Sequence, residues 1–240
     1  MEWMKTHNIA HRGLHTDNEI VPENSLLAMR LAKESGYAME FDIHITKDDK
    51  IVVFHDADLV RMCNANVRVE ESTYSDLKQY RLLSSPEKIP LLSDVLDCVN
   101  GHTPLLIEIK NTKHIDRICS ITLETLKGYS GAYAIQSFNP KIVHWFTKNA
   151  PYIKRGMVAY DMKDSSEPWV NKMIIRHMLL SFWVKPDFIN YEHLSLPLRK
   201  LSKLQKKGVT IIAWTVRTQE ELDRVKRHYS NAVFELFVPK

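Results

Sequence analysis

Charged side chains recur at alternate positions in two strands that otherwise look buried. Glu40 and Asp42 share one face of the first strand, within Tyr37–Asp56, and Glu108 lies in the apolar run Leu105–Lys110. Burying an unpaired carboxylate in an apolar interior costs on the order of several kcal/mol. Three carboxylates that converge there therefore predict a bound cation. The alternative is a half-exposed strand with a hydrated face. Because two such strands occur together, we favour a divalent metal held by Glu40, Asp42 and Glu108.

Basic residues and histidines accompany these carboxylates. Oxygen ligands without cysteine favour Mg²⁺ or Ca²⁺ over zinc. Arg12 and Lys110 provide positive charge suited to a phosphate group, for which arginine has matching geometry. His11 and His55 can exchange protons near neutral pH. The set predicts phosphodiester hydrolysis with His11 and His55 as an acid/base pair, and it leaves open which is the acid.

The composition excludes several other classes. The 240 residues are 44% hydrophobic and 26% charged, which is typical of a globular protein with a core. The net charge of +4 is spread along the chain, so we expect no nucleic-acid partner. There is no signal-like segment and no apolar run of about 18 residues, so a cytoplasmic protein is expected. Cys63, Cys98 and Cys119 are expected to be reduced thiols.

Strand and helix patterns alternate along the chain. The expected strands are centred on Ile9, Phe41, Ile107, Ile135, Val158, Ile189, Ile212 and Phe234. Eight such units in about 250 residues predict a (β/α)8 barrel, in one domain spanning residues 1–240. An open doubly wound sheet would need a glycine-rich first turn, which is missing. Residues 57–88 are expected to form a small insertion with a helix at 75–83, and Ser93 to cap the next helix.

The chain resembles the glycerophosphodiester phosphodiesterase family over most of its length. The motifs that carry the resemblance are His11-Arg12-Gly13, Pro22-Glu23-Asn24-Ser25, Glu40-Phe41-Asp42, His55-Asp56, Ile89-Pro90-Leu91-Leu92, Glu108-Ile109-Lys110, Gln136-Ser137-Phe138 and Trp214-Thr215. The resemblance implies a TIM-barrel enzyme that cleaves deacylated phospholipids, a small-molecule substrate, to sn-glycerol 3-phosphate and an alcohol. It also implies Mg²⁺ or Ca²⁺ on Glu40, Asp42 and Glu108, acid/base roles for His11 and His55, and phosphate contacts from Arg12 and Lys110.

Four further residues are candidates for substrate binding. Glu23 is placed near the metal or the glycerol, and Asn24 either supports the site or caps the first helix. Gln136 is interpreted as part of a polar rim rather than a buried structural amide. Trp214 forms either a wall against the substrate or ordinary packing. His44 shares the face of the carboxylates but is expected to lie beside them or face solvent.

Two segments depart from the family pattern. The last expected strand, 231–237, lacks the usual aspartate-containing turn, which leaves closure of the barrel open. Residues 169–184 are unusually apolar; packing against the barrel is the favoured interpretation, and contact with a membrane or a partner is the alternative. The rival functions are a phospholipase D or lysophospholipase D on the same scaffold, and a catalytically silent barrel that binds phosphate. The oligomeric state is not predicted.

Overall fold

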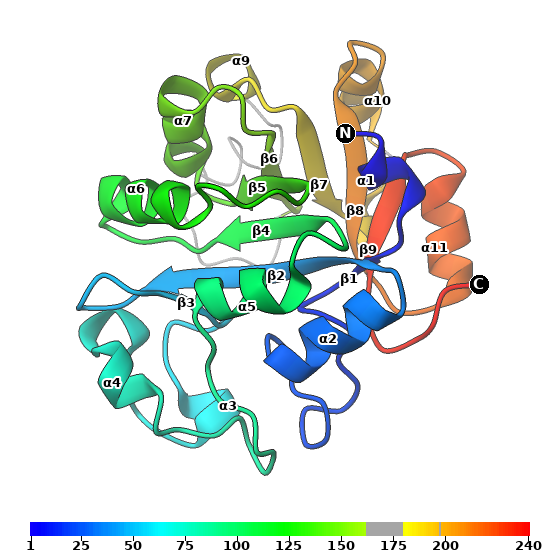
Figure 1. The fold of residues 1–240 in the computed structure, drawn as a ribbon. Helices are drawn as coiled ribbons and strands as arrows, with labels where there is room; N and C mark the ends of the chain where they lie inside the picture. Colours follow the sequence, from blue (N-terminus) through cyan, green and yellow to red (C-terminus); the bar gives the residue numbers. More distant parts are fainter. Residues whose placement is uncertain (162–179, 197) are drawn as a thin grey trace. The chain divides into compact units, whose positions relative to one another are not determined.

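The computed structural model describes residues 1–161, 180–196 and 198–240 (Figure 1). These residues form two compact units. The first comprises Ile9–Tyr133 and the second comprises Met1–Asn8 with Ala134–Lys240. We call them the N-terminal unit and the C-terminal unit and describe each separately.

The sheet of the N-terminal unit is built around one long strand. Its strands are β1 (Ile9–Ala10), β2 (Ala38–Ile45), β3 (Ile51–Val53) and β4 (Leu105–Ile109). β2 pairs in parallel with β1 and β4, and β3 turns back to pair with it in antiparallel orientation. Every residue of β2 is buried, so its polar side chains cannot face bulk water. The predicted strands at Ile9, Phe41 and Ile107 are confirmed, and β3 is an added strand.

Three helices accompany this sheet. They are α2 (Leu26–Glu34), α5 (Leu92–Val99) and α6 (Ile115–Thr125), and α2 packs against α5 (Figure 1). α2 begins where the Ser25 side chain accepts a hydrogen bond from the Ala28 amide. The prediction that Ser93 caps α5 is wrong. The helix starts earlier, at Leu92, and the Asp94 carboxylate accepts from the Leu91 amide at 3.0 Å.

Residues 57–88 have a small apolar core of their own. They contain α3 (Val60–Cys63), the 3₁₀ turn η1 (Val69–Glu71) and α4 (Tyr74–Leu77). This core extends onto β3 and the residue after it, and its buried members are Val52, Phe54, Leu59, Met62, Val69, Leu77, Leu82 and Ile89. The helix expected at 75–83 is shorter, because Leu82 reaches the same core from non-helical backbone.

The C-terminal unit contains five parallel strands among the residues described there. They are β5 (Tyr133–Ser137), β6 (Arg155–Ala159), β7 (Phe188–Glu192), β8 (Thr210–Val216) and β9 (Asn231–Phe234), paired in chain order. The helical elements are α1 (Trp3–Thr6), α7 (Pro140–Asn149), α9 (Ser181–Val184), η2 (His193–Ser195), α10 (Arg199–Gln205) and α11 (Gln219–Lys226). The last strand ends at Phe234, earlier than the predicted 237.

The apolar segment 169–184 lies mostly outside the described residues. Its final turn is α9, in which Phe182 is 77% exposed. Among the residues described, no helix combines the length and the apolar character needed to cross a bilayer.

Candidate active site

Glu40, Asp42 and Glu108 form a buried carboxylate cluster in the N-terminal unit. Asp42 and Glu108 are direct partners across the parallel pair β2 and β4, and Glu40 lies two residues before Asp42 on the same face. Their exposed fractions are 2%, 2% and 6%, for Glu40, Asp42 and Glu108 respectively. One oxygen of each lies within 4.8 Å of the others. The sequence therefore predicted which carboxylates meet.

The electrostatics of this cluster favour a bound cation. Burial, together with the charges of Asp42 and Glu108, raises the pKa of Glu40 well above its usual range. Burial also raises the pKa of Glu108, although Lys110 opposes this. Three converging carboxylate oxygens match the donor set of a hard divalent ion. The residues present therefore fit Mg²⁺ or Ca²⁺ and do not distinguish between them.

Lys110 and Arg12 supply the positive charge next to the carboxylate cluster. Lys110 Nζ donates to Asp42 Oδ1 at 3.0 Å and to Glu108 Oε1 at 2.8 Å. Arg12 Nε lies 3.4 Å from Asp42 Oδ2. Burial alone would raise the pKa of Asp42, but Lys110, His55 and Arg12 hold it well below its usual range. Asp42 is therefore ionised, and both cations are anchored beside it.

A turn with two left-handed residues places Arg12 and His11 beside β2. Arg12 has φ 53° and Gly13 has φ 77°. The Gly13 amide donates to the Glu40 carbonyl at 3.1 Å, and the Arg12 amide donates to Glu40 Oε2 at 3.2 Å. A Cβ at Gly13 would lie 2.9 Å from the backbone carbon of Ala28, so only glycine fits between this turn and α2. His11 Nε2 then lies 3.8 Å from Glu40 Oε2.

Asn24 contacts a carboxylate instead of capping a helix. Its Nδ2 donates to Asp42 Oδ2 at 3.0 Å, and its Oδ1 accepts from the Asp42 amide at 3.2 Å. Ser25 is the cap of α2. The side chain of Asn24 is buried, so it fixes the orientation of Asp42 from within the unit.

Glu23 is held between two arginines. Its Oε1 accepts from Arg12 Nη1 at 2.8 Å and from Arg61 Nη2 at 2.6 Å. Burial alone would raise the pKa of Glu23, but the hydrogen bond from Arg61 and the charge of Arg12 lower it. No motif in the sequence marks Arg61 as a site residue. The only signal for it was its position five residues after Asp56 in a segment of little periodicity.

His55 follows β3 and is oriented by its neighbour. The amide of Phe54 donates to the Asp42 carbonyl at 3.0 Å, which brings the end of β3 back to the level of Asp42. His55 Nδ1 lies 2.6 Å from Asp56 Oδ1. A carboxylate oxygen only accepts, so Nδ1 carries the hydrogen and Nε2 is the nitrogen left for proton exchange.

His44 contacts the backbone of His55 and does not face solvent. It is buried, and its Nε2 lies 3.1 Å from the carbonyl oxygen of His55, to which it must donate. Burial lowers the pKa of His44. A neutral His44 therefore supports the backbone of His55, which is one of the two expected positions.

Gln136 and Trp214 belong to the C-terminal unit. Gln136 is buried, and its Oε1 accepts from Asn190 Nδ2 at 3.1 Å. Trp214 Nε1 donates to the carbonyl oxygen of Ala159 at 3.2 Å, and its ring meets Phe138 edge to face, with centroids 5.6 Å apart. Both side chains are thus ordered by contacts within their own unit, and their roles toward a substrate stay predictions.

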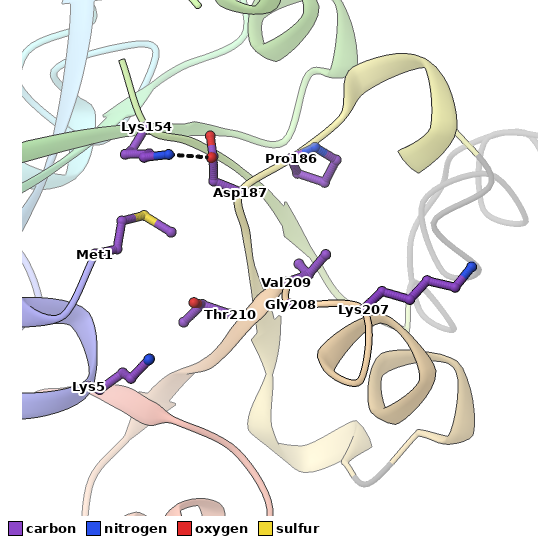
Figure 2. A pocket seen from close by; sticks show the side chains of 9 residues that line it. All are labelled: Met1, Lys5, Lys154, Pro186, Asp187, Lys207, Gly208, Val209 and Thr210. Atoms are coloured by element: carbon purple, nitrogen blue, oxygen red, sulfur yellow. Dashed lines mark hydrogen bonds and ion pairs between the residues drawn. The ribbon is translucent and has the colours of Figure 1, made fainter. Parts of the chain in front are cut away.

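A cavity of about 420 Å³ in the C-terminal unit is lined by residues other than those predicted for the site (Figure 2). Its lining is Met1, Lys5, Lys154, Pro186, Asp187, Lys207, Gly208, Val209 and Thr210. Asp187 is its one carboxylate and is paired with Lys154 at 2.9 Å. None of the predicted site residues lines it, so it is not the candidate active site.

Similar proteins place the chain in a fold class. An Oleispira antarctica phosphodiesterase, solved in complex with the product sn-glycerol-3-phosphate, aligns with a TM-score of 0.81 at 21% identity, covering 95% of this chain and 92% of that one. Together with the order of strands and helices, this likeness defines a (β/α)8 TIM barrel with β3 as an added strand. The predicted fold class is confirmed.

The chain belongs to the Glycerophosphoryl diester phosphodiesterase family, whose sequence profile matches residues 11–235. A glycerophosphodiester phosphodiesterase from Caldanaerobacter subterraneus is 29% identical over 92% of this chain and 90% of its own length. A lysophospholipase D from Rattus norvegicus is 34% identical over 45% of this chain and 37% of its own length. The resemblance found in the sequence motifs is confirmed.

Proposed function

We propose that this protein hydrolyses glycerophosphodiesters to sn-glycerol 3-phosphate and an alcohol. The observation that carries the proposal is the carboxylate cluster with two cationic side chains and two histidines around it. Arg12 contacts Asp42, His11 approaches Glu40, and the end of β3 brings His55 to the level of Asp42. Family membership is consistent with this activity and does not assign the individual roles.

In this proposal Glu40, Asp42 and Glu108 hold Mg²⁺ or Ca²⁺. The bound ion supplies positive charge to the non-bridging phosphoryl oxygens. Arg12 binds the same phosphate, with a planar guanidinium that Glu23 and Asp42 orient. Lys110 donates to Asp42 and Glu108 and adds positive charge beside the proposed phosphate position. Glu23 holds the Arg12 guanidinium, and its placement near the metal or the glycerol stays a prediction.

The two histidines are the proposed acid/base pair. One accepts a proton from the attacking oxygen and the other donates a proton to the departing alkoxide. For His55 the reacting atom is Nε2, because Asp56 holds the hydrogen on Nδ1. For His11 the structure shows Nε2 at 3.8 Å from Glu40 Oε2, beside the proposed metal ligands. Gln136 and Trp214 are proposed as substrate contacts, and the attacking oxygen is that of water or of the glycerol itself.

A lysophospholipase D is the second candidate. Two exposed aliphatic side chains, Ile20 and Val60, are 68% and 52% exposed. Ile20 lies three residues before Glu23, and Val60 directly precedes Arg61. An acyl chain would need such apolar surface, whereas a bare glycerol needs only a small polar pocket.

The test is release of glycerol 3-phosphate from glycerophosphocholine and glycerophosphoethanolamine, and cleavage of lysophosphatidylcholine. Each substrate is assayed with EDTA, with Mg²⁺ and with Ca²⁺, and His55→Gln serves as the inactive control. Metal-dependent turnover of the deacylated substrates is expected. Turnover of the lysolipid alone would favour the second candidate, and binding of glycerol 3-phosphate without any turnover would favour a silent phosphate-binding barrel.

A further inference from the structure

Arg61 connects two parts of the candidate site that are distant in sequence. Its Nη2 and Nη1 donate to the two oxygens of Glu23 at 2.6 and 3.0 Å, and its Nε donates to Asp56 Oδ2 at 2.7 Å. We propose that Arg61 is a positioning residue that orients His55 through Asp56 and Arg12 through Glu23. This inference rests on the proposed function, in which His55 exchanges protons and Arg12 binds phosphate.

The first branch runs through Asp56. Its Oδ2 is taken by Arg61 and its Oδ1 by His55 Nδ1, so the carboxylate plane is fixed at both ends. Asp56 is only partly buried, with its side chain 24% exposed. Without Arg61 the carboxylate can rotate and accept from water instead. His55 would then lose the contact that holds its hydrogen on Nδ1, and Nε2 would be the basic nitrogen less often.

The second branch runs through Glu23. Glu23 Oε1 accepts from Arg12 and from Arg61, and Oε2 accepts from Arg61 and from Asn18 Nδ2 at 3.2 Å. Two guanidinium groups therefore share one buried negative charge. If Arg61 is removed, Glu23 attracts Arg12 alone, and less of the positive charge of Arg12 is available to a phosphate. We expect this branch to affect substrate binding more than the chemical step.

The contacts of Arg61 favour positioning over a structural role. Its side chain is 44% exposed, and it is not a member of the insertion's apolar core. Ion pairs made by a side chain with that much exposure contribute little to stability. Arg68, in the same insertion, is a matched control, because it pairs with Glu71 at 3.2 Å through an exposed contact that involves neither Glu23 nor Asp56.

Steady-state kinetics with glycerophosphocholine test the proposal. Arg61→Ala should lower kcat about 10- to 100-fold and raise KM, as is usual when the partner of a functional side chain is lost. In an Asp56→Asn background Arg61→Ala should still raise KM but lower kcat no further. Arg61→Lys keeps the positive charge but cannot donate to Glu23 and Asp56 with the geometry of a guanidinium. It should therefore retain only part of the activity. Arg68→Ala should match the parent protein.

The proposal would be overturned if kcat and KM of Arg61→Ala lie within twofold of the values for Arg68→Ala. Losses from Arg61→Ala and Asp56→Asn that multiply in full would also overturn it, because the two residues would then act independently. Thermal unfolding of each variant separates loss of folding from loss of positioning. If Arg61→Ala does not fold, Arg61→Lys carries the same comparison.

A second measurement does not depend on turnover. Long-range proton–nitrogen NMR of the imidazole rings reports the tautomer of His55, assigned by its disappearance in His55→Gln. We expect the Nδ1–H tautomer in the parent protein and in Arg68→Ala, and a mixture in Arg61→Ala and Asp56→Asn. An unchanged His55 tautomer in Arg61→Ala would overturn the first branch. An inactive parent protein with the expected tautomer shift would instead contradict the proposed function and leave that branch standing.

Discussion

Asn24 and Asp42 exchange two hydrogen bonds within the N-terminal unit. The amide nitrogen of the Asn24 side chain donates to Asp42 Oδ2 at 3.0 Å, and its oxygen accepts from the Asp42 amide at 3.2 Å. A single buried side chain thus fixes both the backbone and the carboxylate of a proposed metal ligand. Such partners determine which lone pairs a ligand presents.

Asn24→Ala should weaken metal binding and activity about 10- to 100-fold, because Asp42 loses both contacts. Activity titrated with Mg²⁺ or Ca²⁺ is the measurement, and excess metal should restore part of the rate. Ser25→Ala is the control. It removes the cap of α2, at a cost of about 1 kcal/mol, and should leave the metal titration unchanged. Equal metal dependence in the parent protein and Asn24→Ala would contradict the prediction.

Gly13→Ala should destabilise the protein more than Gly36→Ala. Both glycines have positive φ, 77° and 70°, so each substitution carries a similar backbone strain of about 1 kcal/mol. They differ in their surroundings, since a Cβ at Gly13 meets Ala28 at 2.9 Å and one at Gly36 meets nothing within 4 Å. Urea unfolding of the two variants measures the difference. Similar losses would mean that the turn at Gly13 moves away from α2 at little cost.

Glu40→Gln should make the metal-depleted protein more stable. It should also reduce the stabilisation that added metal gives. Burial and the charges of Asp42 and Glu108 raise the pKa of Glu40, so ionising it there is costly and a neutral amide removes that cost. A ligand at about 100 times its Kd stabilises a protein by about 2.7 kcal/mol, and this increment should largely disappear. Thermal unfolding with EDTA, Mg²⁺ and Ca²⁺ is the measurement. An unchanged metal increment would exclude Glu40 as a ligand.

Acid should destabilise the protein partly through His193. Burial lowers its pKa, Arg224 lowers it further by donating to Nδ1 at 2.9 Å, and Arg217 acts in the same direction against Glu221 and Glu192. The unfolded chain therefore binds more protons than the folded one, and stability falls as pH drops below about 6.5. His193→Gln should show a shallower decline in urea unfolding between pH 7.5 and 5. An equally steep decline would assign the effect to other groups.

The strands were predictable because each has an apolar centre that stands out from polar flanks. Glu40, Asp42 and Glu108 were predictable as a group for a related reason. In a strand the alternation of side chains fixes the face, and neighbouring parallel strands place equivalent faces together. Sequence patterns of this kind predict the structure well, because tertiary packing and backbone geometry favour the same arrangement.

Arg61 and the true end of α4 were not predictable from such patterns. Arg61 acts through contacts with Glu23, 38 residues away, and no periodicity records such a pairing. α4 ends at Leu77 because Leu82 satisfies the insertion core from an irregular segment, so apolar spacing alone overestimated the helix. Ser93 failed as a cap because Asp94 provides the first-turn contact one residue later.

The apolar core of residues 57–88 includes Val52 of β3 and Phe54, the residue after β3, and His55 follows Phe54 directly. If this subdomain opens while β2 and β4 stay paired, the order of His55 is lost before the carboxylate cluster is disturbed. Amide hydrogen exchange should then show the subdomain and the residue after β3 exchanging together, faster than β2. On heating, catalytic competence would disappear below the temperature of global unfolding and return on cooling.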